Sequence, residues 1–361
     1  MRILALGNLV FAQELRDLGH EVITCAFGPQ MKTGLFGPGV KQGDFGSGSN
    51  IHLPSAPVPI SQIIKALSPW RPDAVLLGDG STFPLFPGLE LLPVPLLWFA
   101  MDSHIHHNWH PDYAAVFDRI VVAQKAFVPN YLRDPDRQKV RWLPLFAHAD
   151  YDRPLQLERI LGLTFVGTLD PALNPERVAF IQALQNRIDV TVITGDYTEL
   201  YNRSRVVLNQ SVAGELNFRT FEAMACGALL LTEKSDNGLE ALFKDREELV
   251  LYRRGDALDA AAKAQILLEN DTLRTRIAAS GCQQVHAAHT SRHRAEEIIS
   301  ILKDPALEHA VRKRREDSAT IQSHLCRVYD QAARVHRDQN HPSADLYEQF
   351  SILARKQVEA S

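Results

Sequence analysis

The chain has 361 residues, of which 45% are hydrophobic and 23% are charged, a composition typical of a globular protein long enough for two domains. The net charge of -4 provides no basic surface for nucleic acid, and the four scattered cysteines form no CxxC pair, so neither nucleic-acid binding nor a cysteine-based zinc site is expected. The amino terminus lacks a signal-peptide pattern, and the most apolar stretch, residues 83–101, contains four prolines and Glu90, so we expect a cytoplasmic protein without a membrane span.

Short runs rich in Val, Ile and Leu alternate with helical or long connections in the first half. After the first run, a helix is predicted over residues 10–20, and residues 34–50 are too rich in glycine to be anything but a loop. This alternation predicts a parallel sheet buried on both faces, and therefore α/β architecture. The apolar runs cover residues 2–7, 21–27, 73–80, 94–102 and 118–124.

The α/β pattern begins again near residues 155–160 and gives way to continuous helical patterns from about residue 256. We predict a first domain over residues 1–152, a second over 153–304 and a helical C-terminal extension over 305–361. The extension carries the basic cluster RKRRED, residues 312–317. Because acidic residues follow the basic ones at once, a solvated helix face is favoured over contact with an acidic partner or peripheral association with a membrane.

Two consecutive parallel α/β domains place a cleft between the carboxyl ends of their strands, so the turns that follow strands are candidate ligand sites. Gly7 and Asn8 follow the first strand, and Gly167 and Thr168 follow the first strand of the second domain. Each pair is either a tight turn or a place where a ligand approaches the backbone.

The most informative stretch is residues 209–233, where a strand, a glycine-containing loop and a helix follow one another. The backbone N–H groups at the helix start, near Asn217, could hold a diphosphate, and Arg219 could add positive charge. Glu222, within the first turns of the helix, could accept two hydrogen bonds from a ribose diol. One short segment therefore offers recognition of both phosphate and ribose.

The segments FEAMACGALLLTE and NGLEALF resemble the donor-binding signature of glycosyltransferases with the GT-B fold. More closely, YNRSRVVLN, LNFRTFEAMACG, LPLFAHAD and LTFVGTLD resemble the CgeB-like, group 1 glycosyltransferases, over about residues 95–300. The resemblance implies two Rossmann-like domains facing across a cleft, with a nucleotide-diphosphate sugar bound by the second domain. It also implies a glycan, protein or small-molecule acceptor at the first domain, and transfer without an obligatory metal or other cofactor.

The resemblance assigns roles to individual residues of the second domain. Glu222 corresponds to the ribose-binding glutamate, and Tyr197 falls near the base or the sugar. The diphosphate-facing helix start and the first donor loop correspond to Asn217, Phe218, Arg219, Thr220, Gly167 and Thr168.

Two features depart from the pattern of many retaining relatives. Glu215 and Glu222 are separated by six residues instead of seven, and the first donor loop has no basic residue before Arg177. Both the stereochemical outcome and the groups that neutralise the diphosphate therefore stay open. Substitutes for the missing basic residues are Arg219, Arg203 and Arg205.

Residues 102–110, DSHIHHNWH, follow a predicted strand of the first domain and contain four of the 14 histidines. Some pairs are three or four residues apart, which would allow a metal site on a helix, but no distant ligand group completes it. We favour a sugar-binding edge in which Asp102 or His104 is the base, and we keep loop residues that only satisfy one another as an alternative. The predicted sugar contacts are His106, His107, Trp109 and His110.

Two other functions stay open from the sequence. One is a nucleotide-sugar epimerase or hydrolase with the same two domains. The other is a non-catalytic carbohydrate-binding or scaffold protein, which the altered glutamate spacing would suit.

Overall fold

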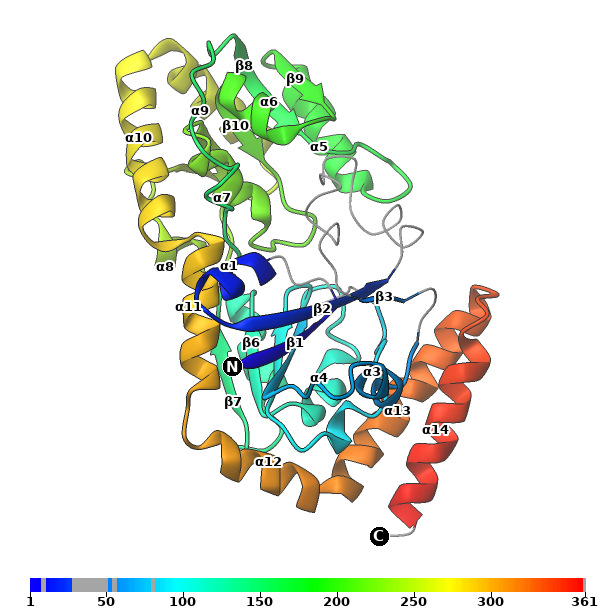
Figure 1. Cartoon of the computed structure of the whole chain (residues 1–361). Helices are drawn as coiled ribbons and strands as arrows, with labels where there is room; N and C mark the ends of the chain where they lie inside the picture. The colour runs from blue at the N-terminus through cyan, green and yellow to red at the C-terminus, as the bar shows by residue number, and fades with distance from the viewer. Residues whose placement is uncertain (8–10, 28–50, 54–56, 79–81, 360–361) are drawn as a thin grey trace.

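The computed structural model describes residues 1–7, 11–27, 51–53, 57–78 and 82–359 (Figure 1). The predicted loop over residues 34–50 and the candidate Asn8 lie outside these ranges. Within them the chain forms two parallel sheets covered by helices, followed by a C-terminal set of helices. The predicted α/β fold class is confirmed.

The first sheet has seven parallel strands in the described residues, in the order β3-β2-β1-β4-β5-β6-β7. Alternate residues of its strands enter two different buried clusters, which is why the apolar runs are nearly continuous. The strands are β1 (Arg2–Leu6), β2 (Glu21–Phe27), β3 (Ile51–Leu53), β4 (Ala74–Gly78), β5 (Leu96–Ala100), β6 (Arg119–Val122) and β7 (Lys139–Trp142).

Helices cover both faces of this first sheet. Helices α1 (Ala12–Asp17) and α11 (Ser291–Leu302) lie on one face, together with Phe11 and Ile298 in the buried cluster there. The other face is covered by α3 (Ile60–Ala66), α4 (His110–Tyr113) and α13 (Ser318–Asp338). Short 3-10 helices connect the strands: η2 (Leu89–Leu91), η3 (Ala114–Val116) and η4 (Lys125–Tyr131).

The second sheet has five parallel strands in the order β12-β11-β10-β8-β9. The strands are β8 (Leu161–Val166), β9 (Val190–Ile193), β10 (Ser204–Asn209), β11 (Leu229–Glu233) and β12 (Val250–Tyr252). The helices that surround it are α5 (Pro175–Gln185), α6 (Tyr197–Arg203), α7 (Phe218–Ala225), α8 (Leu239–Leu242), α9 (Ala257–Glu269) and α10 (Asp271–Ala288). The strand order reverses between β8 and β10, and in the first sheet between β1 and β4. Ligands of open parallel sheets bind at such reversals, outside the carboxyl ends of the strands.

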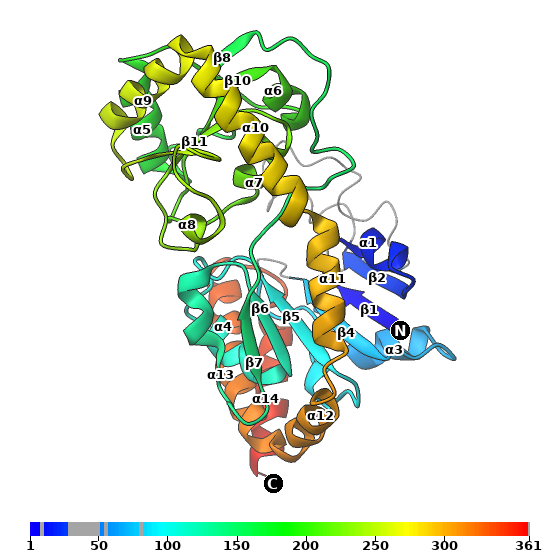
Figure 2. The ribbon, with the colours of Figure 1, turned by 90° about the vertical axis from the view of Figure 1, so that its left-hand side faces the viewer.

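The chain crosses between the two sheets twice, and the two crossings lie side by side. Ala147 accepts a hydrogen bond from the Ser291 amide at 2.8 Å and donates one to the His289 carbonyl at 3.0 Å. Below the crossing, α11 lies on the first sheet, while α10 stays with the second (Figure 2). The predicted boundary at residue 304 groups α11 with the second domain, because a helical pattern does not tell which sheet the helix covers.

The C-terminal extension, α12 (Leu307–Glu316), α13 and α14 (Ala344–Glu359), packs on the first domain (Figure 1). Its basic cluster was predicted to be a solvated helix face, and this is wrong for Arg314, which is only 1% exposed. Arg314 forms a buried ion pair with Asp118 and donates to the backbone carbonyls of Leu92 and Val94 at 2.6 and 2.9 Å. Among the described residues, no helix is both long and apolar enough to cross a membrane.

Candidate functional site

Two arginines lie against one aromatic ring where the strand order of the second sheet reverses. The guanidinium carbons of Arg219 and Arg177 are 4.9 and 5.6 Å from the centroid of the Phe165 ring. Burial, together with repulsion from Arg219, lowers the pKa of Arg177 to about 10, so the Arg177 side chain remains a cation at neutral pH. In the described part of the chain neither forms a salt bridge with a carboxylate, so the pair is suited to an anionic ligand.

Hydrogen bonds fix both guanidinium groups at the strand ends. Arg219 donates to the Val166 carbonyl and to Asn209 Oδ1, each at 2.9 Å, and its Nε is buried without a partner. Arg177 donates to Gln210 Oε1 at 2.8 Å. A Cβ atom at the next residue, Gly167, would lie only 3.0 Å from the Arg219 guanidinium. Gly167 therefore leaves the room that Arg219 occupies.

Arg177 is the basic residue that the sequence analysis did not propose as a substitute. It enters the site because α5 begins at Pro175 and carries it back over β8. The substitutes Arg203 and Arg205 are wrong, because they lie at the amino end of β10, where Arg203 pairs with Glu199 at 2.8 Å. The distance in sequence from the first donor loop does not tell Arg177, which joins the site, from Arg203 and Arg205, which do not.

The helix α7 begins beside this arginine pair. Its N-cap residue, Asn217, turns its side chain to Asn209 at 3.1 Å and does not cap the first N–H groups of the helix. Thr220, a predicted donor contact, is only 1% exposed, and its hydroxyl bonds Asn209 and Asn217, both at 3.3 Å. We therefore correct the prediction for Thr220: its hydroxyl stabilises the helix start and is not open to a ligand.

Glu222 lies one helical turn beyond Arg219 on α7, and its carboxylate acts on Tyr197 at the start of α6. Glu222 is half-buried on α7, and Tyr197 is half-buried at the start of α6. Burial raises the pKa of Tyr197, and the Glu222 carboxylate raises it further. The structure therefore groups these two predicted donor residues on neighbouring helices. Thr168 follows Gly167 and is half-buried.

The first domain contacts the loop that leads into α7. Gln124, only 1% exposed, donates from Nε2 to the Leu216 carbonyl at 3.0 Å and accepts from the Leu216 amide at 2.8 Å. Because Ala100 of β5 is paired with Val122 of β6, Asp102 and Gln124 leave the same edge of the first sheet. Nearby, Phe218 of α7 meets the edge of Phe146 with ring centroids 5.4 Å apart. Asp102 therefore lies on the edge that faces the start of α7.

Nothing in the sequence marked Gln124 as important, yet its side chain joins the two domains. Its replacement is therefore expected to lower the free energy of unfolding. Gln124→Leu has a similar volume but leaves the buried N–H and C=O of Leu216 without partners, so the free energy of unfolding should fall by about 2 kcal/mol. Chemical denaturation would measure this change. Gln265→Leu, on the exposed surface of α9, is the control; equal effects of the two substitutions would contradict the role of Gln124.

The histidine-rich segment is divided by burial. His110 is fully buried, with Nδ1 2.7 Å from the Tyr131 hydroxyl. Trp109 is 4% exposed, and the centroid of its ring lies 5.2 Å from that of Phe83. The predicted sugar contacts at Trp109 and His110 are therefore wrong, because both side chains belong to the core of the first domain.

The remaining histidines lie nearer the surface. His104 and His106 are half-buried, and the exposed His107 donates from Nδ1 to the His104 carbonyl at 3.3 Å. Within the described ranges, no three His, Cys, Asp or Glu side chains are grouped as metal ligands would be. Asp102, His104, His106 and His107 thus remain the candidates for contact with an acceptor.

Gly7 lies at the strand reversal of the first sheet. Its φ is +71°, and a Cβ atom there would lie 2.9 Å from the Gly78 carbonyl oxygen. The close approach of β1 and β4 alone therefore requires glycine. A ligand contact at Gly7 stays a prediction.

Comparison with known proteins agrees with this architecture. Residues 164–300 match a family described as glycosyl transferase-like. No curated protein is significantly similar in sequence to the chain.

Three solved structures illustrate the shared fold. A glycosyltransferase from Rickettsia africae is 14% identical, with a TM-score of 0.58 over 84% of this chain and 98% of its own. Anabaena HepE, solved with UDP and glucose, is 13% identical, with a TM-score of 0.61 over 84% of this chain and 99% of its own. Sucrose-phosphate synthase from Thermosynechococcus elongatus is 13% identical, with a TM-score of 0.54 over 83% and 98%.

The fold is therefore GT-B, with two Rossmann-like domains and C-terminal helices. The family match identifies residues 164–300 as glycosyl transferase-like, and the solved neighbours share the fold of the chain. The narrower resemblance to CgeB-like proteins stays a prediction.

Proposed function

We propose that the protein transfers a sugar from a nucleoside-diphosphate sugar to a hydroxyl group of a glycan, protein or small-molecule acceptor, without a metal or other cofactor. The observation that carries this proposal is the pair Arg177 and Arg219, two cations held 5.6 and 4.9 Å from the centre of one ring without a carboxylate partner among the described residues. A diphosphate is an anion that both guanidinium groups could bind with charge-assisted hydrogen bonds.

The surroundings of the arginine pair fit the rest of such a donor. The start of α7 offers backbone N–H groups and the positive end of a helix dipole, and Glu222 follows one helical turn after Arg219 along the same helix. The structural neighbour HepE is solved with UDP-glucose, which makes a uridine nucleotide the first donor to test.

The reaction would proceed by displacement at the anomeric carbon. The acceptor oxygen forms a bond to that carbon while the carbon–oxygen bond to the diphosphate breaks, and the diphosphate leaves with the electron pair. Arg177, Arg219 and the helix start would stabilise the charge that develops on the leaving group. Asp102 and His104, on the edge of the first sheet that faces α7, are the two candidates to take the acceptor's proton.

Isothermal titration calorimetry with UDP tests the donor site directly. If Glu222 holds the ribose diol with two charge-assisted hydrogen bonds, Glu222→Ala should cost about 2 to 3 kcal/mol, which is roughly a 30- to 150-fold increase in Kd. Glu199→Ala, an exposed acidic residue on α6, should bind UDP like the unchanged protein.

The same protein preparations can be tested for turnover. Release of UDP from UDP-glucose should require an acceptor. If UDP-glucose is instead converted to an isomer or to free sugar without acceptor, as fast as it is consumed with acceptor, the protein would be an epimerase or hydrolase. Failure to bind UDP, GDP or ADP would contradict the proposal.

A further inference from the structure

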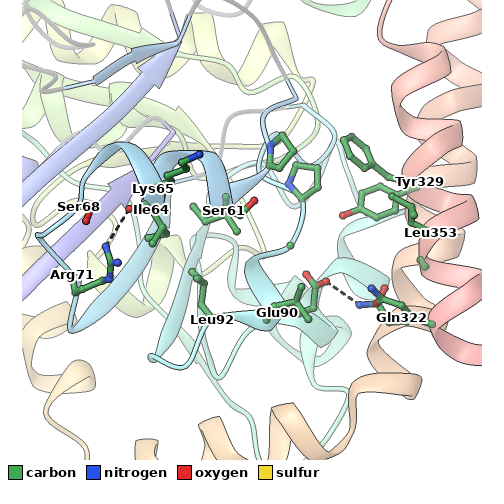
Figure 3. Close-up of a pocket in the computed structure, with 18 residues that line it drawn as sticks. Ser61, Ile64, Lys65, Ser68, Arg71, Glu90, Leu92, Gln322, Tyr329 and Leu353 are labelled. Atoms are coloured by element: carbon green, nitrogen blue, oxygen red, sulfur yellow. Dashed lines mark hydrogen bonds between the residues drawn. The ribbon is translucent and has the colours of Figure 1, made fainter. Parts of the chain in front are cut away.

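A cavity of about 600 Å³ lies between α3, the segment around η2, and the C-terminal helices α13 and α14 (Figure 3). It shares no lining residue with the candidate donor site, and it lies on the face of the first sheet that α13 covers. Its volume is within the range of small-molecule sites, roughly 300 to 1,000 Å³. The C-terminal extension thus does more than cover the sheet, because it builds one wall of this cavity.

The walls of the cavity are mainly apolar. Ile64 and Leu92 line one side, and Leu353 of α14 contributes to the other. Phe350, also on α14, lines the cavity as well. Leu91 and Leu353 remain 57% and 55% exposed. When an apolar ligand displaces water from apolar side chains that face an open cavity, the free energy of the system falls.

Positive charge is concentrated at one end of the cavity (Figure 3). Lys65 and Arg71 are exposed there, beside Ser68. Arg71 donates to the carbonyls of Ile64 and Trp70, at 3.3 and 3.2 Å. In the part of the chain that the structure describes, neither Lys65 nor Arg71 has a carboxylate partner. This end is therefore complementary to an anion.

The carboxyl group of Glu90 lies away from that end, beside Gln322 (Figure 3). Glu90 is 8% exposed and accepts a hydrogen bond from Gln322 Nε2 at 2.9 Å. Burial raises the pKa of Glu90, which favours its neutral form. The inner part of the cavity thus holds a buried, hydrogen-bonded carboxyl group, and the other charged lining residues among those that the structure describes are the two cations.

We propose that this cavity binds a single-chain amphiphile with an anionic head group, the head at Lys65 and Arg71 and the chain along Ile64 and Leu92 toward Phe350. An alkyl carboxylate and an alkyl phosphate share this chemistry. The site is independent of the donor site, so it stands or falls separately from the proposed transfer reaction.

Calorimetry on the full chain tests the proposal with decanoate, decyl phosphate and uncharged decanol, each below its aggregation concentration. The two anions should bind more tightly than decanol. The double substitution Lys65→Glu and Arg71→Glu should weaken the anions by about tenfold or more and leave decanol unchanged. Whichever anion binds more tightly identifies the head group as carboxylate or phosphate.

Filling the cavity should remove all binding. Ile64→Trp is one such variant, and Leu353→Trp, at an exposed position, is a second that does not depend on core packing. Lys303→Glu, an exposed lysine outside the cavity, is the matched control. The proposal would be overturned by absence of binding, by equal affinities for decanoate and decanol, or by an equal effect of Lys303→Glu. UDP affinity should be the same in all these variants.

Discussion

Replacing both Arg177 and Arg219 with glutamine is expected to weaken the binding of UDP by about 1,000-fold. Each guanidinium group that bonds the diphosphate contributes about 2 kcal/mol as a charge-assisted interaction, so loss of both removes about 4 kcal/mol. Arg177→Gln alone should cost about 30-fold, because Arg219 remains beside Phe165. Titration calorimetry gives these values directly. The affinity of the unchanged protein should also fall as salt is added, and that of the double variant much less.

Arg203→Gln is the matched control for the arginine pair. Arg203 lies at the amino end of β10, at the opposite edge of the same sheet, and its partner is Glu199. Its replacement should leave UDP affinity unchanged. Because Arg219 also bonds Val166 and Asn209, circular dichroism must show that the variants are folded. A loss of less than threefold in the folded double variant would contradict a diphosphate site at these arginines.

The largest effect on stability is expected for Arg314→Ala. The Arg314 and Asp118 side chains are 0% exposed, and Arg314 also donates to three backbone carbonyls in η2 and the segment that leads from it to β5: those of Glu90, Leu92 and Val94. Without Arg314, Asp118 keeps the buried Arg137 at 3.6 Å as its cationic partner, and the three carbonyls lose this donor. Removing one partner from such a buried charged cluster costs about 3 to 5 kcal/mol. The free energy of unfolding measured with urea should fall by this amount, a large fraction of a typical total.

Arg315→Ala provides the comparison on the same helix. Arg315 is exposed, so its removal should change the free energy of unfolding by less than about 0.5 kcal/mol. If Arg314→Ala changed stability as little as this, the anchoring of the C-terminal extension through Asp118 would be contradicted.

Much of the fold could be predicted because hydrophobic periodicity records burial directly. Strands buried on both faces read as continuous apolar runs, so β1, β4, β5 and β6 were expected where the structure has them. The helix that begins at Phe218 was also expected, with Arg219 and Glu222 on it. These features depend on residues that are close in the chain.

The parts that could not be predicted depend on residues far apart in the chain. Nothing local separates Arg314 from the exposed Arg312 and Arg315, because only the position of Asp118, 196 residues earlier, decides which arginine is buried. In the same way, His110 has the polarity of a ligand residue, but the ring of Trp98 at 4.7 Å makes it part of the core. Residue type describes what a side chain can do, and burial decides whether it is free to do it.

The sequence by itself determined the α/β class, its restart in a second domain, the helical end of the chain and the helix that carries Glu222. Only the tertiary structure decided that Arg177 joins Arg219, that Gln124 ties the first domain to the donor loop, and that α13 and α14 enclose a cavity. The physical reason is that periodicity and helix propensity act over a few residues, whereas pairing, burial and enclosure arise only where distant segments meet.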